Sequence, residues 1–128
     1  MKFLLDTHVF LWWVIDSPLI SEKVRELMSD GSSDLFWSSG SSWEIAIKYA
    51  NGKLPLPDQP EIFISSELTN NRISSLPITN EHAFRAGNLP IYHRDPFDRI
   101  LIAQSNLENM SLVSNDHIMT QYDVNIFW

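Results

Sequence analysis

The chain has 128 residues, 44% of them hydrophobic and 12% aromatic, which favours one folded domain over residues 1–128 and excludes a disordered chain. Nine basic residues against 16 acidic ones give a net charge of −7, which excludes a protein that holds nucleic acid through general basicity. There is no cysteine, and no apolar run approaches the roughly 20 residues of a membrane span. We therefore expect a cytoplasmic protein without a signal peptide, disulfides, thiolate metal sites or membrane contact.

The first half of the chain predicts strands and helices in alternation. A short apolar run ends at Asp6, and Thr7 is expected to cap the helix that follows. Ser41 or Ser42 is expected to cap a later helix, which ends near Gly52. The predicted elements are a strand at 2–5, helices at 8–14 and 19–28, a strand at 35–38 and a helix at 43–50.

The second half begins with a proline-rich loop at 53–60 and continues the alternation. Pro77 suits a central strand poorly, so we expect the third strand to end there or to lie at an edge. The predicted elements are a weak helix at 61–68, a strand at 73–78, helices at 79–86 and 96–108, a strand at 111–114, a short capped segment at 117–121 and a candidate fifth strand at 124–127. This order predicts an α/β fold with a mostly parallel sheet of four to five strands and helices on both faces.

Acidic residues lie at the ends of several predicted elements, namely Asp6, Glu44, Asp98 and Asp116. Strand ends and helix starts converge at the carboxyl edge of a parallel sheet, so we expect these side chains to meet there. Carboxylates held close together raise one another's pKa unless a cation neutralises them. Because oxygen ligands suit hard divalent ions, the sequence predicts a site for Mg²⁺ or Mn²⁺ rather than for zinc.

Each acid also has an ordinary structural explanation. Asp6 can be a turn or capping residue, and Asp116 can cap the segment at 117–121. Glu44 lies four residues before Lys48, so a surface ion pair explains it, although the surrounding helix is apolar almost all round. The set of acids, rather than any single member, supports a metal site.

The RDPFDR segment opens the helix expected at 96–108. Asp95 suits the N-cap, Pro96 the first helical position and Asp98 the third, and the helix dipole favours both negative charges. For Asp95 we prefer the capping role. Asp98 can support the helix start and also face the crevice at its head.

Four segments in this order, LLDTHVFLWW, SSWEIAIK, HRDPFDRILIAQ and LVSND, resemble the PIN-domain ribonucleases, specifically the VapC-type toxins of toxin–antitoxin pairs. The resemblance covers 2–128 and implies an α/β/α sandwich formed by a single PIN domain at 1–128. The family's metal-binding and catalytic acids fall on Asp6, Glu44, Asp98 and Asp116. Supporting positions fall on Thr7, Asp95 and Ser114.

The resemblance also implies an activity and partners. It implies an endoribonuclease that hydrolyses RNA phosphodiester bonds with Mg²⁺ or Mn²⁺, cuts structured RNA such as tRNA or rRNA, forms a homodimer and is inhibited by a cognate antitoxin. Metal-assisted attack by water would leave a 5′-phosphate and a 3′-hydroxyl. Arg99, Lys48 and Arg94 are candidates for binding the flanking phosphates, with salt bridges to neighbouring acids as the alternative.

Several rival classes can be compared with this one. A receiver domain needs a late lysine, whereas the last lysine here is Lys53, and an Asp-x-Asp phosphatase is excluded because Thr7 and His8 follow Asp6. A metal-free ribonuclease would use a histidine pair, but the four histidines show no recognisable spacing. The main alternative is a PIN-like module that binds RNA or protein without cutting. Most of the aromatic residues are expected in the core, while an exposed subset can form a groove for an antitoxin helix.

Overall fold

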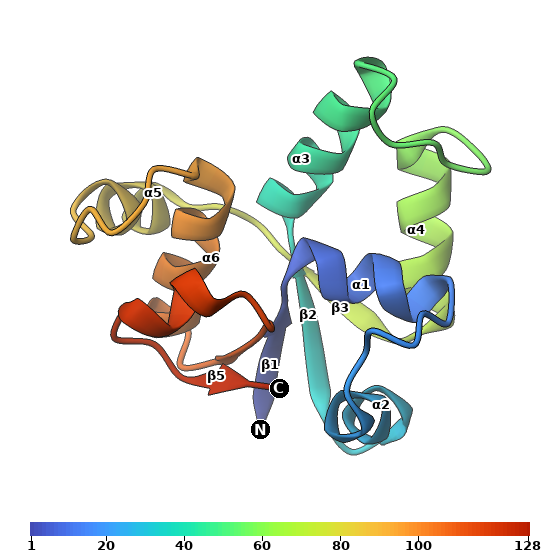
Figure 1. The fold of residues 1–128 in the computed structure, drawn as a ribbon, viewed down its shortest axis with the longest axis horizontal. Helices are drawn as coiled ribbons and strands as arrows, with labels where there is room; N and C mark the ends of the chain where they lie inside the picture. The colour runs from blue at the N-terminus through green and yellow to red at the C-terminus, as the bar shows by residue number, and fades with distance from the viewer.

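A sheet of five parallel strands forms the centre of the molecule, as the computed structural model of residues 1–128 shows (Figure 1). The strand order is β3-β2-β1-β4-β5, so the first strand pairs with β2 on one side and β4 on the other. This arrangement confirms the predicted α/β class. The strands are β1 (Lys2–Leu5), β2 (Asp34–Ser38), β3 (Ile73–Leu76), β4 (Ser111–Val113) and β5 (Ile126–Phe127).

Helices cover both faces of this sheet (Figure 1). One hydrophobic cluster joins the sheet to α1, α2, α3 and α4, and a second joins its other face to α6, against which α5 packs. None of the helices has both the length and the apolar character needed to cross a membrane. The helices are α1 (Thr7–Val14), α2 (Glu22–Ser29), α3 (Ser39–Ala50), α4 (Pro60–Asn70), α5 (Asn80–Gly87), α6 (Pro96–Leu107) and the 3-10 helix η1 (His117–Gln121).

The central strand β1 is apolar on both faces, which is typical of a parallel sheet covered on both sides. Phe3 and Leu5 belong to one hydrophobic cluster and Leu4 belongs to the other. The register pairs Leu5 with Val113 of β4, so β1 and β4 end at the same edge of the sheet. The first polar residue after each strand therefore lies at this carboxyl edge.

Three helices begin at residues other than those predicted. Asp6, not Thr7, is at the N-cap of α1. Helix α2 begins after Ser21, whose hydroxyl accepts a hydrogen bond from the Val24 N–H at 3.2 Å. Helix α3 begins directly after β2, with Ser38 as its cap, so neither of the later serines caps it. The weak helix propensity of serine hid this early start, which the strand end and the Ser38 hydroxyl impose.

The remaining boundaries differ little from the prediction. Strand β3 ends just before Pro77, as expected for a residue without a backbone N–H. Helix α4 is longer than predicted because Pro60 occupies its first turn, where proline costs no hydrogen bond. The candidate fifth strand is confirmed, although it is only two residues long.

Candidate active site

Asp6 directly follows β1 and carries a buried carboxylate at the carboxyl edge of the sheet. It occupies the N-cap position of α1, yet its side chain makes no capping hydrogen bond. The Ser114 hydroxyl instead donates to Asp6 Oδ2 at 2.7 Å. Asp6 Oδ1 accepts no hydrogen bond, and its nearest cationic partner is His8 Nδ1 at 3.8 Å. The capping explanation for this carboxylate is therefore wrong, and one of its oxygens is available to a ligand.

Asp98 lies in the first turn of α6, on a segment that the Asp95 side chain caps. Asp95 Oδ1 accepts hydrogen bonds from the backbone N–H groups of Phe97 and Asp98 at 2.9 and 3.2 Å, which confirms its capping role. Asp98 Oδ2 accepts from His93 Nε2 at 3.0 Å, and Oδ1 accepts no hydrogen bond. Asp98 can therefore present one free oxygen while its helix start is stabilised by a different acid.

The Asp98 carboxyl has a strongly perturbed acidity. Its pKa is raised from 3.8 to about 6, chiefly by burial and in smaller part by the charges of Asp95 and Asp6, whereas the hydrogen bond from His93 acts in the opposite direction. The contribution of Asp6 means that these two acids are close enough to repel each other across the site. Such repulsion is the property that the sequence predicted for a metal-binding cluster.

Glu44 is buried on α3, although the sequence allowed a surface position. Its Oε2 accepts from Lys48 Nζ at 2.8 Å, so the expected ion pair exists but in a largely buried setting. The pKa of His8 is raised chiefly by its interaction with Asp6 and further by the charge of Glu44. The charges of Glu44 and Asp6 therefore both act on the His8 imidazole in α1.

Asp116 lies farther out and is exposed. Its Oδ1 accepts from the Ile118 N–H at 3.1 Å and caps η1, as the sequence allowed. Its backbone N–H donates to the Ser114 hydroxyl at 3.1 Å. Because the same hydroxyl donates to Asp6, a single serine connects the segment of Asp116 to the buried acid.

The Thr7 hydroxyl does not contact any of these acids. It donates to Ser41 Oγ at 2.9 Å and so ties the start of α1 to α3 below the carboxylates. Both hydroxyls are buried. Thr7 thus holds together the two helices that carry Asp6 and Glu44.

The side chains fit a hard cation in type but do not form a complete ligand set as they stand. No three acidic or histidine side chains converge closely enough to hold a metal ion. Glu44 is engaged by Lys48, and Asp98 by His93. However, Asp6, Glu44 and Asp98 each keep one oxygen without a hydrogen bond. A bound ion would have to draw these free oxygens together.

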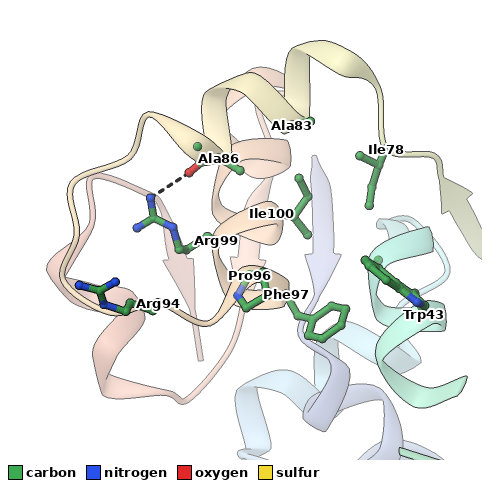
Figure 2. A pocket seen from close by; sticks show the side chains of 11 residues that line it. Trp43, Ile78, Ala83, Ala86, Arg94, Pro96, Phe97, Arg99 and Ile100 are labelled. Carbon is green, nitrogen blue, oxygen red and sulfur yellow. Dashed lines mark hydrogen bonds between the residues drawn. The ribbon is translucent and has the colours of Figure 1, made fainter. Parts of the chain in front are cut away.

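The Arg99 guanidinium faces backbone carbonyls rather than the acids, so the salt bridge that the sequence allowed does not form. Figure 2 shows its bond to the carbonyl of Ala86, at 3.0 Å. The guanidinium thereby joins the end of α5 to the following loop and forms no ion pair. Its other acceptors are the carbonyls of Leu89, Pro90 and His93 and the hydroxyl of Tyr122.

Sequence reasoning missed His93, which bonds to Asp98, and Tyr122, which bonds to His93. Tyr122 Oη lies 2.8 Å from His93 Nδ1 and 3.2 Å from Arg99 Nη1. The only signal in the sequence was a histidine five residues before the acid, a spacing that no regular helix or strand would bring into contact.

Two hollows flank the acids. One, of about 360 Å³, lies between α3, α5 and α6, where Trp43 and Phe97 pack edge to face with ring centroids 5.4 Å apart (Figure 2). Arg94 also lines this hollow. The other, of about 280 Å³, lies beside α1 and is lined by Lys48 and Lys53 among others. Four of the nine lysine and arginine residues of this acidic chain therefore line the two hollows, namely Lys48, Lys53, Arg94 and Arg99.

One curated protein is similar to part of this chain. The chain is 31% identical over 64 residues to Ribonuclease VapC16 of Mycobacterium tuberculosis, an alignment that covers 50% of this chain and 44% of that protein. The chain therefore matches less than half of the length of this relative.

Solved structures show the same fold. The chain matches VapBC2 of Rickettsia felis bound to a promoter DNA fragment with a TM-score of 0.74 and 17% identity, over 99% of this chain and 98% of that one. It matches FitAcB of Neisseria gonorrhoeae with a TM-score of 0.65 and 20% identity, over 98% and 96% of the two chains. For VapBC-1 of nontypeable Haemophilus influenzae the values are 0.66 and 18%, over 99% and 97%. Since the model of the PIN domain matches residues 3–125, the chain belongs to the PIN domain family.

Proposed function

We propose that this protein is a metal-dependent endoribonuclease of the VapC toxin type. The proposal rests on two acids from distant parts of the sequence, Asp6 buried at the carboxyl edge of the sheet and Asp98 in the first turn of α6. Each has one oxygen fixed by a donor and one free, and the charge of Asp6 helps to raise the pKa of Asp98. The partial match to a ribonuclease from M. tuberculosis supports the same reaction class.

Asp6, Glu44 and Asp98 would hold Mg²⁺ or Mn²⁺, with Asp116 completing the set. When bound, the ion would lower the pKa of a water molecule and neutralise charge on the scissile phosphate. Ser114 orients Asp6 for this role through its 2.7 Å hydrogen bond. Hydrolysis of this kind leaves a 5′-phosphate and a 3′-hydroxyl, and no histidine has to take part as an acid or base.

RNA would be held by local cations, because the chain as a whole is acidic. Lys48 is already paired with Glu44, but Lys53 and Arg94 form no ion pair and line two different hollows. In this proposal, Lys53 and Arg94 bind the phosphates that flank the cleaved bond. Structured RNA such as tRNA or rRNA is the proposed substrate.

The protein would act as a homodimer and would be inhibited by a cognate antitoxin. Two of the structural relatives are VapBC proteins, one of them bound to promoter DNA. This chain also exposes large apolar side chains that partners would cover, among them Trp43, Phe84, Ile91 and Tyr92. Light scattering of the purified chain, alone and after coexpression with the product of the adjacent reading frame, tests both associations. A monomer that captures no such product would contradict them.

The decisive experiment is cleavage of purified RNA with Mn²⁺, with Mg²⁺ and with EDTA. We expect cleavage only with metal and 5′-phosphate ends on the products, and we expect Asp6→Asn and Asp98→Asn to abolish it. Asp34→Asn is the matched control, because Asp34 is an exposed acid at the start of β2, away from the carboxyl edge. Retained cleavage in both site variants would overturn the assignment.

Two other outcomes would point to the alternatives. Cyclic phosphate products that form in EDTA would indicate metal-free histidine catalysis. RNA or protein binding without cleavage under any of the metal conditions would indicate a non-catalytic PIN-like module.

A further inference from the structure

A chain of hydrogen bonds leads from Arg99 through Tyr122 and His93 to Asp98. Arg99 Nη1 lies 3.2 Å from Tyr122 Oη, Tyr122 Oη lies 2.8 Å from His93 Nδ1, and His93 Nε2 lies 3.0 Å from Asp98 Oδ2. The His93 and Asp98 side chains are 17% and 18% exposed, so bulk water competes only weakly for these bonds. The four residues come from α6, the loop before it and the segment after η1.

The direction of every bond in this chain can be worked out from its donors. Arg99 has only donors, so Tyr122 Oη accepts from it. Tyr122 Oη also accepts from the His93 backbone N–H at 3.3 Å. Its own proton can reach two acceptors, His93 Nδ1 at 2.8 Å and the His93 carbonyl at 3.5 Å, and the shorter distance directs it to Nδ1. With Nδ1 accepting, a neutral imidazole carries its proton on Nε2 and donates it to Asp98.

We propose that His93 is a positioning residue that holds Asp98 in the orientation needed to bind a divalent ion, with its tautomer fixed by Tyr122 and Arg99. The inference rests on the function proposed above. His93 occupies Asp98 Oδ2 and leaves Oδ1 free, as Ser114 occupies one oxygen of Asp6 and leaves the other free. Donors that orient ligating carboxylates in this way typically change metal affinity by roughly 10- to 100-fold when removed.

The His93 imidazole is not required to hold its own loop. The backbone N–H of His93 bonds to Tyr122, and its carbonyl accepts from Arg99 at 3.3 Å. The carbonyls of Leu89 and Pro90 also accept from Arg99, at 3.0 and 2.9 Å. Truncating the imidazole therefore leaves the loop attached and removes the side-chain contacts with Asp98 and Tyr122 Oη.

The test measures Mn²⁺ binding to the full chain by calorimetry or electron paramagnetic resonance. We expect His93→Ala to weaken binding roughly 10- to 100-fold and His93→Gln to restore part of the loss, because the glutamine amide can donate to Asp98. His117→Ala is the control, since this exposed histidine has no side-chain hydrogen bond to an acid. A merely structural His93 would change thermal stability and leave Mn²⁺ affinity unchanged.

A second measurement starts from the unaltered chain and so does not depend on whether a variant folds. Long-range ¹H–¹⁵N spectra of the metal-free chain should show His93 protonated on Nε2 alone, and Tyr122→Phe should allow the other tautomer. Protonation on Nδ1 in the unaltered chain would overturn the inference. If Asp6→Asn binds Mn²⁺ as well as the unaltered chain, the proposed metal site itself fails. If Asp6→Asn loses binding and His93→Ala does not, only the role of His93 fails.

Discussion

Replacing Asp98 with asparagine should stabilise the metal-free fold at neutral pH while it removes an acid from the site. The Asp98 pKa rises from 3.8 to about 6, chiefly because of burial. One pKa unit corresponds to roughly 1.4 kcal/mol, so the charge costs the folded state at most about 3 kcal/mol. Since the side chain is 18% exposed, solvent screens part of this cost, and we expect a gain of about 1–2 kcal/mol.

The direction in which this contribution to stability changes with pH follows from proton binding. Between pH 3.8 and about 6 the folded chain retains a proton on Asp98 that the unfolded chain has released. The contribution of Asp98 to stability therefore falls as the pH rises through this window, and the full cost is present above it. The amide of Asp98→Asn has no such cost and can still accept the hydrogen bond from His93. Its advantage should thus be largest near pH 7.5 and decline toward pH 4.

Urea unfolding of both chains in EDTA, followed by tryptophan fluorescence, measures this difference. The comparison is best made at pH 7.5 and pH 6, above the sequence pI of about 4.8, where the chain keeps its net negative charge. Adding Mn²⁺ at about 100 times its dissociation constant should stabilise the unaltered chain by about 2.7 kcal/mol. Asp98→Asn should gain much less, so the order of stability should reverse.

Two results would refute this reasoning. In the first, a folded Asp98→Asn chain is less stable than the unaltered chain in EDTA at pH 7.5. In the second, Mn²⁺ stabilises both chains equally. The variant Asp34→Asn serves as a control for the general loss of one negative charge, because Asp34 is exposed.

Three further substitutions test the packing around the site. Arg99→Lys should lower the free energy of unfolding by roughly 2–3 kcal/mol in urea, because an ammonium has fewer donors than the guanidinium uses; an unchanged value would mean that the carbonyls are hydrated instead. Gly40→Ala should lose about 1 kcal/mol despite better helix propensity, since its Cβ would lie 3.1 Å from a methyl group of Ile100; a gain would show that α3 and α6 can separate. Trp13→Phe removes an indole N–H that donates to Asn71 Oδ1 at 2.8 Å, and thermal unfolding should show a loss of about 1 kcal/mol, whereas no loss would show that water replaces the bond.

The sheet was predictable because its strands are short apolar runs separated by helical segments. Parallel strands buried on both faces leave this pattern directly in the sequence, as Phe3, Leu4 and Leu5 illustrate. Helix starts were less predictable. At Ser38 and Asp6, the strand end rather than a favoured capping sequence decides where the helix begins.

The position of Asp6 beside Ser114 at the carboxyl edge was also predictable, because the parallel strands β1 and β4 end together. The partners of Asp98 were not. His93 reaches Asp98 only because the intervening loop turns back over α6, and Tyr122 joins them from a segment 29 residues beyond His93. For Arg99 the sequence offered phosphate binding or a salt bridge to a neighbouring acid, and it did not reveal the backbone carbonyls that the folded loop supplies.

The bond between Ser114 and Asp6 spans 108 positions of the sequence, and the strands that carry them are adjacent at the middle of the sheet. A growing polypeptide that has not yet produced β4 can bury neither the flank of β1 nor the Asp6 carboxylate. Under the proposed function, translation yields an inactive product until β4 and Ser114 have been made, and a premature stop upstream of Ser114 leaves the toxin inactive. Synthesis itself thereby gives the cell a delay in which an inhibitor can arrive first.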